Sequence, residues 1–405
     1  MEPLLGDRTL FPKLEARAYL GHASVSPASQ AVEEAVAAML AAQARRGVGA
    51  LEEWLPVRRR LRERLARLLG CAPEDLALVP NTTQGVLDVA LCFPWNPGDR
   101  VLVFQGEFPA NVTPWQQVSH LFGLEVHLLP LARLRSPDVL HPLESALQKG
   151  ARMVAVSAVQ FQTGLRMPLE EIGELCRRYG ATFFVDGIQA LGVVPLDVRA
   201  AGIDFLASGS HKWLMGLEGV GFLYVAPCWL SQLKPRVAGW LSHEEPLRFL
   251  LEGGGHLRYD RPIRKQADFL EIGSGNLVGH VALEASVALI ESLGVGAIHA
   301  HVNRYLDALE QGLESRGFAS FRPVRRSGIL SVLPPAGWAV PELAHGLARR
   351  GVVCNTPDGL LRFSPHWPNR LDEVPLVLEA LDEIMAGRTD PGTAPRRPSG
   401  SGARR

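Results

Sequence analysis

Short apolar runs alternate with longer amphipathic stretches from residue 75 to residue 225, and this rhythm constrains the fold more than any other feature. DLALVP is followed by TQGVLDVAL, RVLVFQ by NVTPWQQVSHLF, LEVHLLP by DVLHPLESAL, and RMVAVSAV by LEEIGELCRRYG. The runs TFFVD, DFLASGS and VGFLYV complete a series of seven. Strands separated by helices predict an α/β fold with a mostly parallel seven-stranded sheet and helices on both faces. In such sheets ligands bind at the carboxyl ends of the strands.

The pattern changes after about residue 276, where NLVGHVALEASVALIESLG and AIHAHVNRYLDALEQGLESRG predict two long helices. Short strands and further helices follow, as expected of a smaller α+β domain. We predict four segments: an N-terminal segment near the functional site (1–30), a large ligand-binding domain (31–276), a small C-terminal domain (277–387) and a disordered tail (388–405).

The charges balance, with 42 basic and 42 acidic side chains, so the chain lacks the basic surplus that attracts nucleic acids or anionic membranes. We interpret the Arg-rich stretch at 51–69, LEEWLPVRRRLRERLARLL, as a solvated helix face rather than a nucleic-acid patch.

No run approaches the ~18 apolar residues of a membrane span. The first residues also lack a signal-peptide pattern, so we expect a cytoplasmic protein with no membrane or nucleic-acid partner.

The cysteines do not form a pattern typical of disulfides or zinc, because the five lie far apart and no CxxC pair occurs. His299 and His301 are too close in sequence to share a helix face, and we expect them at the surface. We predict no metal site. The chain has only five Lys, so each is a candidate for a specific role.

Thr82 and Thr83 lie in the motif NTTQG, between a predicted strand and a predicted helix. Hydroxyls and free amides at a helix N-terminus form an anion site, most often for phosphate. Taken alone, the motif is explained better by ordinary capping of the helix.

Asp186 and Lys212 both follow predicted strands. A carboxylate at the end of a strand points into the ligand crevice, although an Asp that begins a turn is common. Lys212 stands between small polar residues with His211 on one side and apolar residues on the other. A Lys in such a pocket can form a Schiff base, although a single Lys is usually a surface residue.

Arg362 and Phe108 complete the set of candidates. The Arg362 guanidinium could capture a substrate carboxylate with two hydrogen bonds, or it could pair with a nearby acid. Phe108 offers an aromatic face. A phosphate-binding helix start, an aromatic ring, an Asp, a Lys and an Arg are the groups that pyridoxal 5′-phosphate requires, and together they predict this cofactor.

The sequence resembles the class V aminotransferase family of pyridoxal-phosphate enzymes with fold type I, which includes cysteine desulfurases, kynureninases and isopenicillin N epimerase-like proteins. ASGSHKWLMGLEGVGFLYV (207–225) is the most specific part, supported by VDGIQALGVVPLDV (185–198) and EFPANVTPW (107–115). The resemblance extends from YLGHAS, beginning at residue 19, to RFSPH, ending at residue 366.

The resemblance implies a role for each matching residue. Lys212 would hold the cofactor aldehyde and move protons, and Asp186 would pair with the ring nitrogen. Gln189 would contact the ring oxygen and Phe108 would stack on the ring. Arg362 would bind the substrate carboxylate, with His22 and Gln160 as further substrate-side or cofactor-side groups, or else as core residues. The family's own Ser position falls on Gly209 here, so either neighbouring Ser could help to hold the phosphate. The residues implied for the phosphate are Thr82, Thr83, Ser208, Ser210 and His211.

Ser274 lies in EIGSGN, which resembles a family loop whose hydroxyl reaches the phosphate of the other subunit. This resemblance implies a homodimer with shared active sites.

Cys354 does not match the nucleophile of the cysteine desulfurases. The family carries that Cys on a loop well before the substrate Arg, whereas only seven residues separate Cys354 from Arg362 here. We interpret Cys354 as a buried strand residue, and a persulfide-forming desulfurase is not expected.

The function we expect is a pyridoxal-phosphate enzyme that acts on an amino acid, with cleavage of a C–S or other β bond ahead of transamination or epimerisation. A cofactor-binding scaffold without catalysis is an alternative, as is a nicotinamide oxidoreductase based on the weak Gly loop GSGNLVG (273–279).

Overall fold

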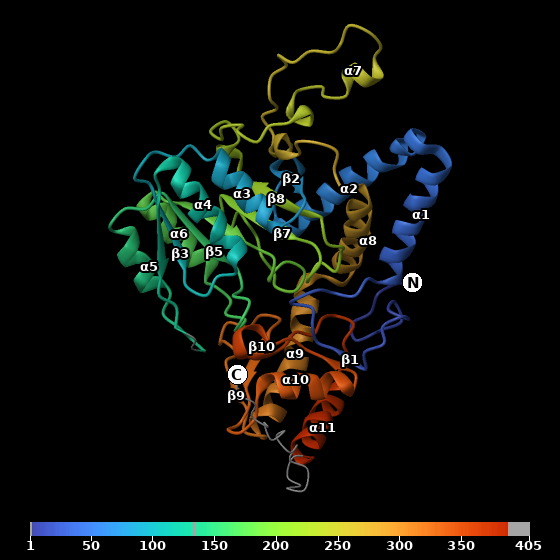
Figure 1. The fold of residues 1–405 in the computed structure, drawn as a ribbon, viewed down its shortest axis with the longest axis vertical. Coiled ribbons are helices and arrows are strands. Elements are labelled where there is room, and N and C mark those ends of the chain that lie inside the picture. The colour runs from blue at the N-terminus through green and yellow to red at the C-terminus, as the bar shows by residue number, and fades with distance from the viewer. Residues whose placement is uncertain (1, 133–134, 388–405) are drawn as a thin grey trace, which may run out of the picture.

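A central sheet in the order β2-β8-β7-β6-β5-β3-β4 dominates the computed structural model, which describes residues 2–132 and 135–387 (Figure 1). In chain order the strands are β2 (Leu76–Val79), β3 (Arg100–Phe104), β4 (Glu125–Leu129), β5 (Met153–Ser157), β6 (Thr182–Asp186), β7 (Phe205–Gly209) and β8 (Gly221–Val225). Every pairing is parallel except those of β8, which is antiparallel to β7 and β2. The predicted mostly parallel sheet of seven strands is confirmed. The predicted tail, 388–405, lies outside the described residues.

Burial explains why most of these strands are continuous apolar runs. All five residues of β5, β6, β7 and β8 are buried, as expected for strands covered on both faces. The edge strand β4 has exposed positions at Glu125 and Leu128 and is the least buried of the seven. The centre of the sheet is therefore rigid, and the carboxyl ends of β5, β6 and β7 are fixed relative to one another.

Four helices connect the strands of this sheet: α3 (Thr82–Cys92), α4 (Thr113–Phe122), α5 (Leu140–Leu147) and α6 (Leu169–Tyr179). Gly85 brings α3 unusually close to the sheet, because a Cβ at this position would lie 2.8 Å from the Cβ of Ala207 in β7. The N-terminus of α3 is consequently held against the end of β7.

Three long helices, α1 (Gln30–Arg46), α2 (Leu51–Leu69) and α8 (Leu277–Leu293), pack together beside the sheet (Figure 1). The expectation of a solvated Arg face on α2 holds only in part, because the side chains of Arg59, Arg60 and Arg67 are exposed whereas those of Arg58, Arg62 and Arg64 are half-buried. Its arginines form ion pairs with acids brought from far along the chain: Arg58 and Arg62 with Glu271, Arg60 and Arg64 with Glu284, and Arg64 and Arg67 with Glu291. Distant acids on other elements are invisible to a local helix pattern.

The lower part of the molecule in Figure 1 contains α9 (Val295–Glu314), α10 (Val340–Arg349) and α11 (Glu373–Ala386) around a three-stranded antiparallel sheet. That sheet has the order β12-β10-β9, with β9 (Ala319–Ser320), β10 (Leu330–Leu333) and β12 (Leu361–Phe363). The N-terminal segment joins this part, because β1 (Ala18–Tyr19) pairs in parallel with β11 (Val352–Val353). The division of the chain into domains stays a prediction.

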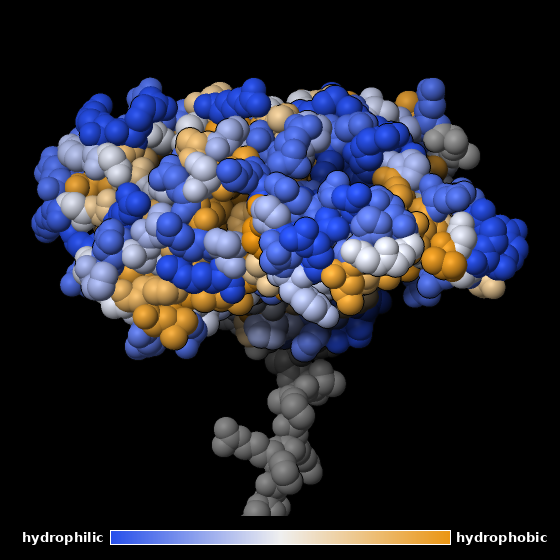
Figure 2. All heavy atoms as spheres, turned by 90° about the horizontal axis from the view of Figure 1, so that it is seen from above, coloured by the Kyte–Doolittle hydropathy of each residue, from blue (hydrophilic) through white to orange (hydrophobic). Residues whose placement is uncertain are grey.

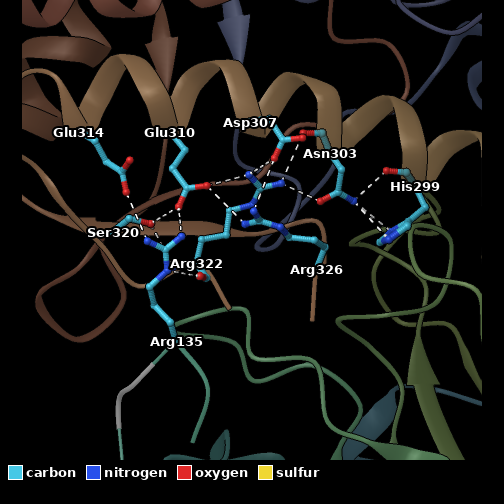
Figure 3. Close-up of polar contacts among 9 residues, drawn as sticks. All are labelled: Arg135, His299, Asn303, Asp307, Glu310, Glu314, Ser320, Arg322 and Arg326. Atoms are coloured by element: carbon cyan, nitrogen blue, oxygen red, sulfur yellow. Dashed lines mark hydrogen bonds and ion pairs between the residues drawn. The ribbon is translucent and has the colours of Figure 1, made fainter. Parts of the chain in front are cut away.

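An ion-pair network centred on the buried Arg322 and Glu310 anchors α9 (Figure 3). Arg322 is fully buried and bonds to Asp307 at 2.6 Å and Glu310 at 3.0 Å. Arg135, from the segment after β4, reaches the same helix at Glu310 (3.1 Å) and donates to the Arg322 carbonyl (3.1 Å). The network therefore connects the central-sheet part of the chain to α9.

The sequence predicted that both histidines near the start of α9 lie at the surface, and this prediction was wrong. His301 is buried and contacts the Asn369 carbonyl through Nε2 at 2.8 Å. His299 is half-buried, with Nδ1 3.0 Å from the Val193 carbonyl. Helix α9 is enclosed on more than one side, and single-face periodicity does not show that.

Within the described ranges, no single helix is long and apolar enough to cross a membrane. The pair α8 and α9 meets these criteria only when taken together, and it is bent by 79°. No group of three or more His, Cys, Asp or Glu side chains suited to a metal ion occurs in the same ranges.

Candidate active site

A cavity of about 580 Å³ opens at the carboxyl ends of β6 and β7, where the sequence predicted a ligand site. Its wall is built from four parts of the chain: the N-terminal segment, the start of α3, the ends of the central strands, and the region between β11 and β12. The predicted residues that line it are Thr82, Thr83, Phe108, Asp186, Gln189, His211, Lys212 and Arg362. Residues separated by up to 280 positions thus meet in one place.

Lys212 and Asp186 supply opposite charges to this cavity. Burial lowers the pKa of Lys212 to about 8, with nearby Arg362 lowering it further and Asp186 opposing the shift. Burial raises the pKa of Asp186 to about 6, against the effects of a hydrogen bond from the Ile188 amide and of the Lys212 charge. At neutral pH the amine is therefore closer to its neutral, nucleophilic form than an exposed lysine would be.

The start of α3 forms the second feature of the site. The Asn81 side chain caps this helix by accepting a hydrogen bond from the Gln84 amide at 2.8 Å, so neither threonine is needed as the cap. Thr82 is buried, and its hydroxyl has no hydrogen-bond partner among the described residues. The first amides of a helix also lack acceptors within the helix. An anion such as phosphate would satisfy both kinds of group.

Gly209 shapes this end of the cavity at the position where the sequence comparison with the family expected a Ser. A Cβ there would lie 3.3 Å from the Thr82 hydroxyl and 3.2 Å from Ile188 Cδ1, closer than most real side chains pack. The glycine therefore avoids a close contact with the unpaired hydroxyl.

Phe108 and Phe161 form an aromatic wall. Their rings pack edge to face with centroids 5.3 Å apart, and the Lys212 amine lies 5.4 Å from the centroid of Phe108. Phe108 is 44% exposed, so its ring is free to take a planar ligand. The preceding residue, Glu107, is half-buried and accepts from the Ser157 amide (2.7 Å) and Asn111 Nδ2 (3.1 Å), and desolvation of its carboxyl raises its pKa to about 7.

Arg362 comes from β12 and is held by two hydrogen bonds, each 2.7 Å long, to the Phe161 carbonyl and the Ser24 hydroxyl. Its Nε is buried and has no partner in the described chain. Asn355 pairs with Arg362 through reciprocal backbone hydrogen bonds, and its side-chain oxygen likewise has no partner there. This end of the cavity is therefore able to bind a carboxylate and a second polar group.

Gln189 lines the cavity in an orientation fixed from both sides. Its Nε2 donates to the Ala23 carbonyl at 3.0 Å, and its Oε1 accepts from the Trp213 indole at 2.8 Å. The second hydrogen on Nε2 has no partner among the described residues.

Five predicted residues do not line this cavity. Ser208 donates to the Gly209 carbonyl and Ser210 to the Leu217 carbonyl, so neither hydroxyl faces the phosphate end. His22 is buried against Ser26, and Gln160 folds its own loop by accepting from the Thr163 amide at 2.7 Å. Ser274 is exposed on the surface and does not line the cavity of its own chain.

Cys354 is half-buried just after β11, and its thiol packs against the hydrophobic core. Burial raises its pKa to about 12, which disfavours the reactive thiolate. Its neighbour Asn355, not Cys354, lines the cavity.

Sequence reasoning missed several residues of the wall: Ser24, Val25, Phe161, Ile188, Glu218, Asn355 and Thr356. Asn355 and Thr356 lie two and three residues after the short strand β11, and the rule used for Asp186 could have identified them. Ser24 and Phe161 lie in loops with no local signal.

These observations test whether pyridoxal phosphate suits the site. The chain supplies an amine at Lys212, a buried carboxylate at Asp186 and an exposed aromatic face at Phe108. The unpaired Thr82 hydroxyl beside Gly209 matches a phosphate. The residues present therefore fit this cofactor.

Comparison with known proteins agrees with this geometry. Residues 18–359 match the family model described as aminotransferase class-V. The chain is 32% identical to an isopenicillin N epimerase from Amycolatopsis lactamdurans, with 80% of this chain and 84% of the epimerase aligned. It is 27% identical to a probable cysteine desulfurase from Methanothermobacter thermautotrophicus, covering 92% and 96%. Among solved structures, a mutant of C-DES with glycine covalently linked to its pyridoxal-phosphate cofactor superposes with a TM-score of 0.85 at 23% identity, covering 93% and 98%.

Proposed function

The chain belongs to the class V aminotransferase family of pyridoxal-phosphate-dependent enzymes, and from this premise we propose that it cleaves a C–S or other β bond of an amino acid. The observation that supports a catalytic role is the convergence of Lys212, Asp186 and Arg362 on one cavity. A protein that only held the cofactor would have no need for a carboxylate-binding Arg.

Pyridoxal phosphate, when bound, supplies an aldehyde that combines with amines and a protonated ring that withdraws electrons from the substrate α-carbon. In our proposal Asp186 keeps the ring nitrogen protonated. Thr82, Thr83 and His211 hold the phosphate, and Gln189 offers its remaining N–H to the ring oxygen. Phe108 covers one face of the ring.

Lys212 is proposed as the group that carries the cofactor and then moves protons at the substrate. Its pKa of about 8 places it near neutrality, where an amine both accepts and returns a proton efficiently. Arg362 binds the substrate carboxylate through its unpaired Nε and the outer part of the guanidinium, which sets the orientation of the α-carbon bonds. For a substrate with a C–S bond at the β-carbon, removal of the α proton with loss of the thiolate, followed by addition of water, would yield a thiol, ammonia and pyruvate.

Support for a lyase without a cysteine nucleophile comes from the wall beside Arg362. Asn355 occupies the cavity there, whereas the Cys354 thiol packs into the core with a raised pKa. A persulfide mechanism would need a mobile, exposed thiolate.

The reaction is tested with the cofactor-loaded protein and a panel of L- and D-amino acids that includes cysteine, cystine and cysteine S-conjugates. We expect pyruvate and ammonia in equal amounts from at least one of them, no product with Lys212→Ala, and unchanged turnover with Cys354→Ser. Keto-acid-dependent amine transfer or inversion of the α-carbon without elimination would assign the enzyme to transamination or epimerisation instead. Loss of sulfur release in Cys354→Ser would point to a desulfurase.

We also propose that the enzyme is a homodimer in which Ser274 reaches the partner's cofactor phosphate. Ser274 is exposed, and the segment 240–259 carries exposed apolar side chains: Trp240, Phe249, Leu250, Leu251, Leu257 and Tyr259. The surface seen from above is hydrophilic with hydrophobic patches between (Figure 2). Sedimentation velocity is expected to give twice the 44.1 kDa chain mass, and a monomer with full activity would contradict the proposal.

A further inference from the structure

The loop that carries Lys212 has four consecutive carbonyls, and each accepts a hydrogen bond from outside the loop. The Ser26 amide donates to His211 (2.7 Å) and the Ser26 hydroxyl to Lys212 (2.6 Å). The next two carbonyls, of Trp213 and Leu214, bond to His366 Nε2 (2.7 Å) and the Ser286 hydroxyl (2.6 Å). The Lys212 carbonyl also accepts from the Met215 amide within the loop at 3.0 Å.

The hydrogen positions of the two histidines behind this loop follow from their partners. Ser26 gives its hydroxyl hydrogen to Lys212, so the 2.7 Å contact between Ser26 and His22 requires His22 to donate from Nδ1. The Trp367 amide donates to His366 Nδ1 at 2.7 Å, so the hydrogen of His366 is on Nε2 and points at the Trp213 carbonyl. Both rings are neutral and each has one fixed tautomer.

The environment keeps both histidines uncharged. They are buried, with ring centroids 5.3 Å apart in an edge-to-face arrangement. Burial lowers the pKa of each ring, to about 4 for His366, and the proximity of His366 lowers the pKa of His22 further. The pair is therefore a stable hydrogen-bonding unit across the neutral pH range.

The same unit is joined to the substrate side of the cavity. The N-terminal segment and the strand that ends near His366 are tied at Ser364, which accepts from the His22 amide (3.2 Å) and donates to the Leu20 carbonyl (3.0 Å). Arg362 in that strand bonds to Ser24 of the same segment at 2.7 Å. Hydrogen bonds therefore connect Arg362, the residue proposed to bind substrate, to the residues that hold the Lys212 loop.

We propose that His22, Ser26 and His366 are positioning residues, which act through the His211, Lys212 and Trp213 carbonyls to fix Lys212 relative to Arg362. The inference rests on the proposed function of Lys212. None of the three lines the cavity, so their influence passes through the backbone of the loop.

The test compares disruptive with conservative substitutions in the cofactor-loaded protein. Ser26→Ala and His366→Leu remove the donors, whereas Ser26→Thr and His366→Gln keep a donor in the same place. We expect the first two to shift the pH midpoint of the cofactor's visible band by ~0.3–1 unit and to lower kcat ~3–10-fold, with KM changed less than about 2-fold, and the second two to restore the native values.

Ser327→Ala is the matched control, because Ser327 is also buried and donates to a carbonyl that lies outside the Lys212 loop (Gly164, 2.7 Å). It is expected to lower the melting temperature without moving the band midpoint. If Ser26→Ala and His366→Leu behave as Ser327→Ala does, the contacts are only structural and the proposal is overturned. If Ser26→Ala or His366→Leu does not fold, the conservative variants still test the proposal. A shifted band midpoint in Ser26→Thr or His366→Gln would contradict it. A protein that shows the band but converts no amino acid would refute the proposed function alone, because the band midpoint still reports on Lys212.

Discussion

Burial moves the charges of Lys212 and Asp186 toward neutrality, and this is the main electrostatic property of the site at the scale of single residues. The pKa of the amine falls to about 8 and that of the carboxyl rises to about 6. The residue types were predictable from sequence, because only a few side chains can bind an aldehyde, a ring nitrogen or a carboxylate. The orientation of smaller groups was not. Ser208 and Ser210 flank Gly209 just before Lys212, yet their hydroxyls donate to nearby backbone carbonyls.

Asp186 should make the stability of the cofactor-free protein depend on pH. Its pKa in the folded chain is about 6, above the ordinary value near 4, so the folded state binds the proton more tightly. The associated stability is present at pH 4 and is lost as the pH rises through 6. We expect Asp186→Asn to gain on the order of 1–3 kcal/mol relative to the native chain between pH 4 and pH 6, with no further gain above pH 7.

Urea unfolding of both proteins from pH 4 to pH 8 measures this difference. Asp382→Asn serves as the control, since Arg316 lowers the pKa of Asp382 and the carboxyl is exposed. A difference between Asp186→Asn and the native chain that stays constant over this range would show that Asp186 has an ordinary pKa.

At the scale of elements, the contact between α2 and α8 is organised by charge. Helix α2 carries the arginines and the facing acids come from α8 and from Glu271, which also accepts a hydrogen bond from the Leu78 amide of β2 at 2.7 Å. The helices themselves were predictable from apolar periodicity. Their pairing was not, because Glu271 and Glu284 lie more than 200 residues from the arginines they bind.

Glu271→Gln should destabilise the fold much more than Glu291→Gln. Glu271 is 7% exposed and neutralises Arg58 and Arg62, so its loss leaves two partly buried charges without a counter-ion. We expect a loss of about 2–3 kcal/mol in the free energy of unfolding. The side chain of Glu291 is 33% exposed, and its substitution should cost less than about 1 kcal/mol. Equal losses in denaturant unfolding would contradict the role assigned to Glu271.

At the scale of the whole molecule, the site depends on contacts between the two ends of the chain. The N-terminal segment adds Ser24 and Val25 to the cavity and pairs with the C-terminal region through β1 and β11. The alternation of strands and helices predicted the central sheet and the edge at which the ligand site lies. It carried no information on long-range closure, and for this reason the sequence left His22 and Gln160 open between the cavity and the core. In the structure neither residue lines the cavity.

Every role proposed for the cavity depends on attachment of pyridoxal phosphate to Lys212, which borohydride reduction and peptide mapping can test. The purified protein is loaded with the cofactor, its visible spectrum is recorded, and the complex is reduced with borohydride before peptide mapping. We expect a visible band that disappears on reduction, with the cofactor mass found on the peptide containing Lys212 and absent from Lys212→Ala. A protein that remains colourless with the cofactor, or a label on any of the other four lysines, would contradict the account.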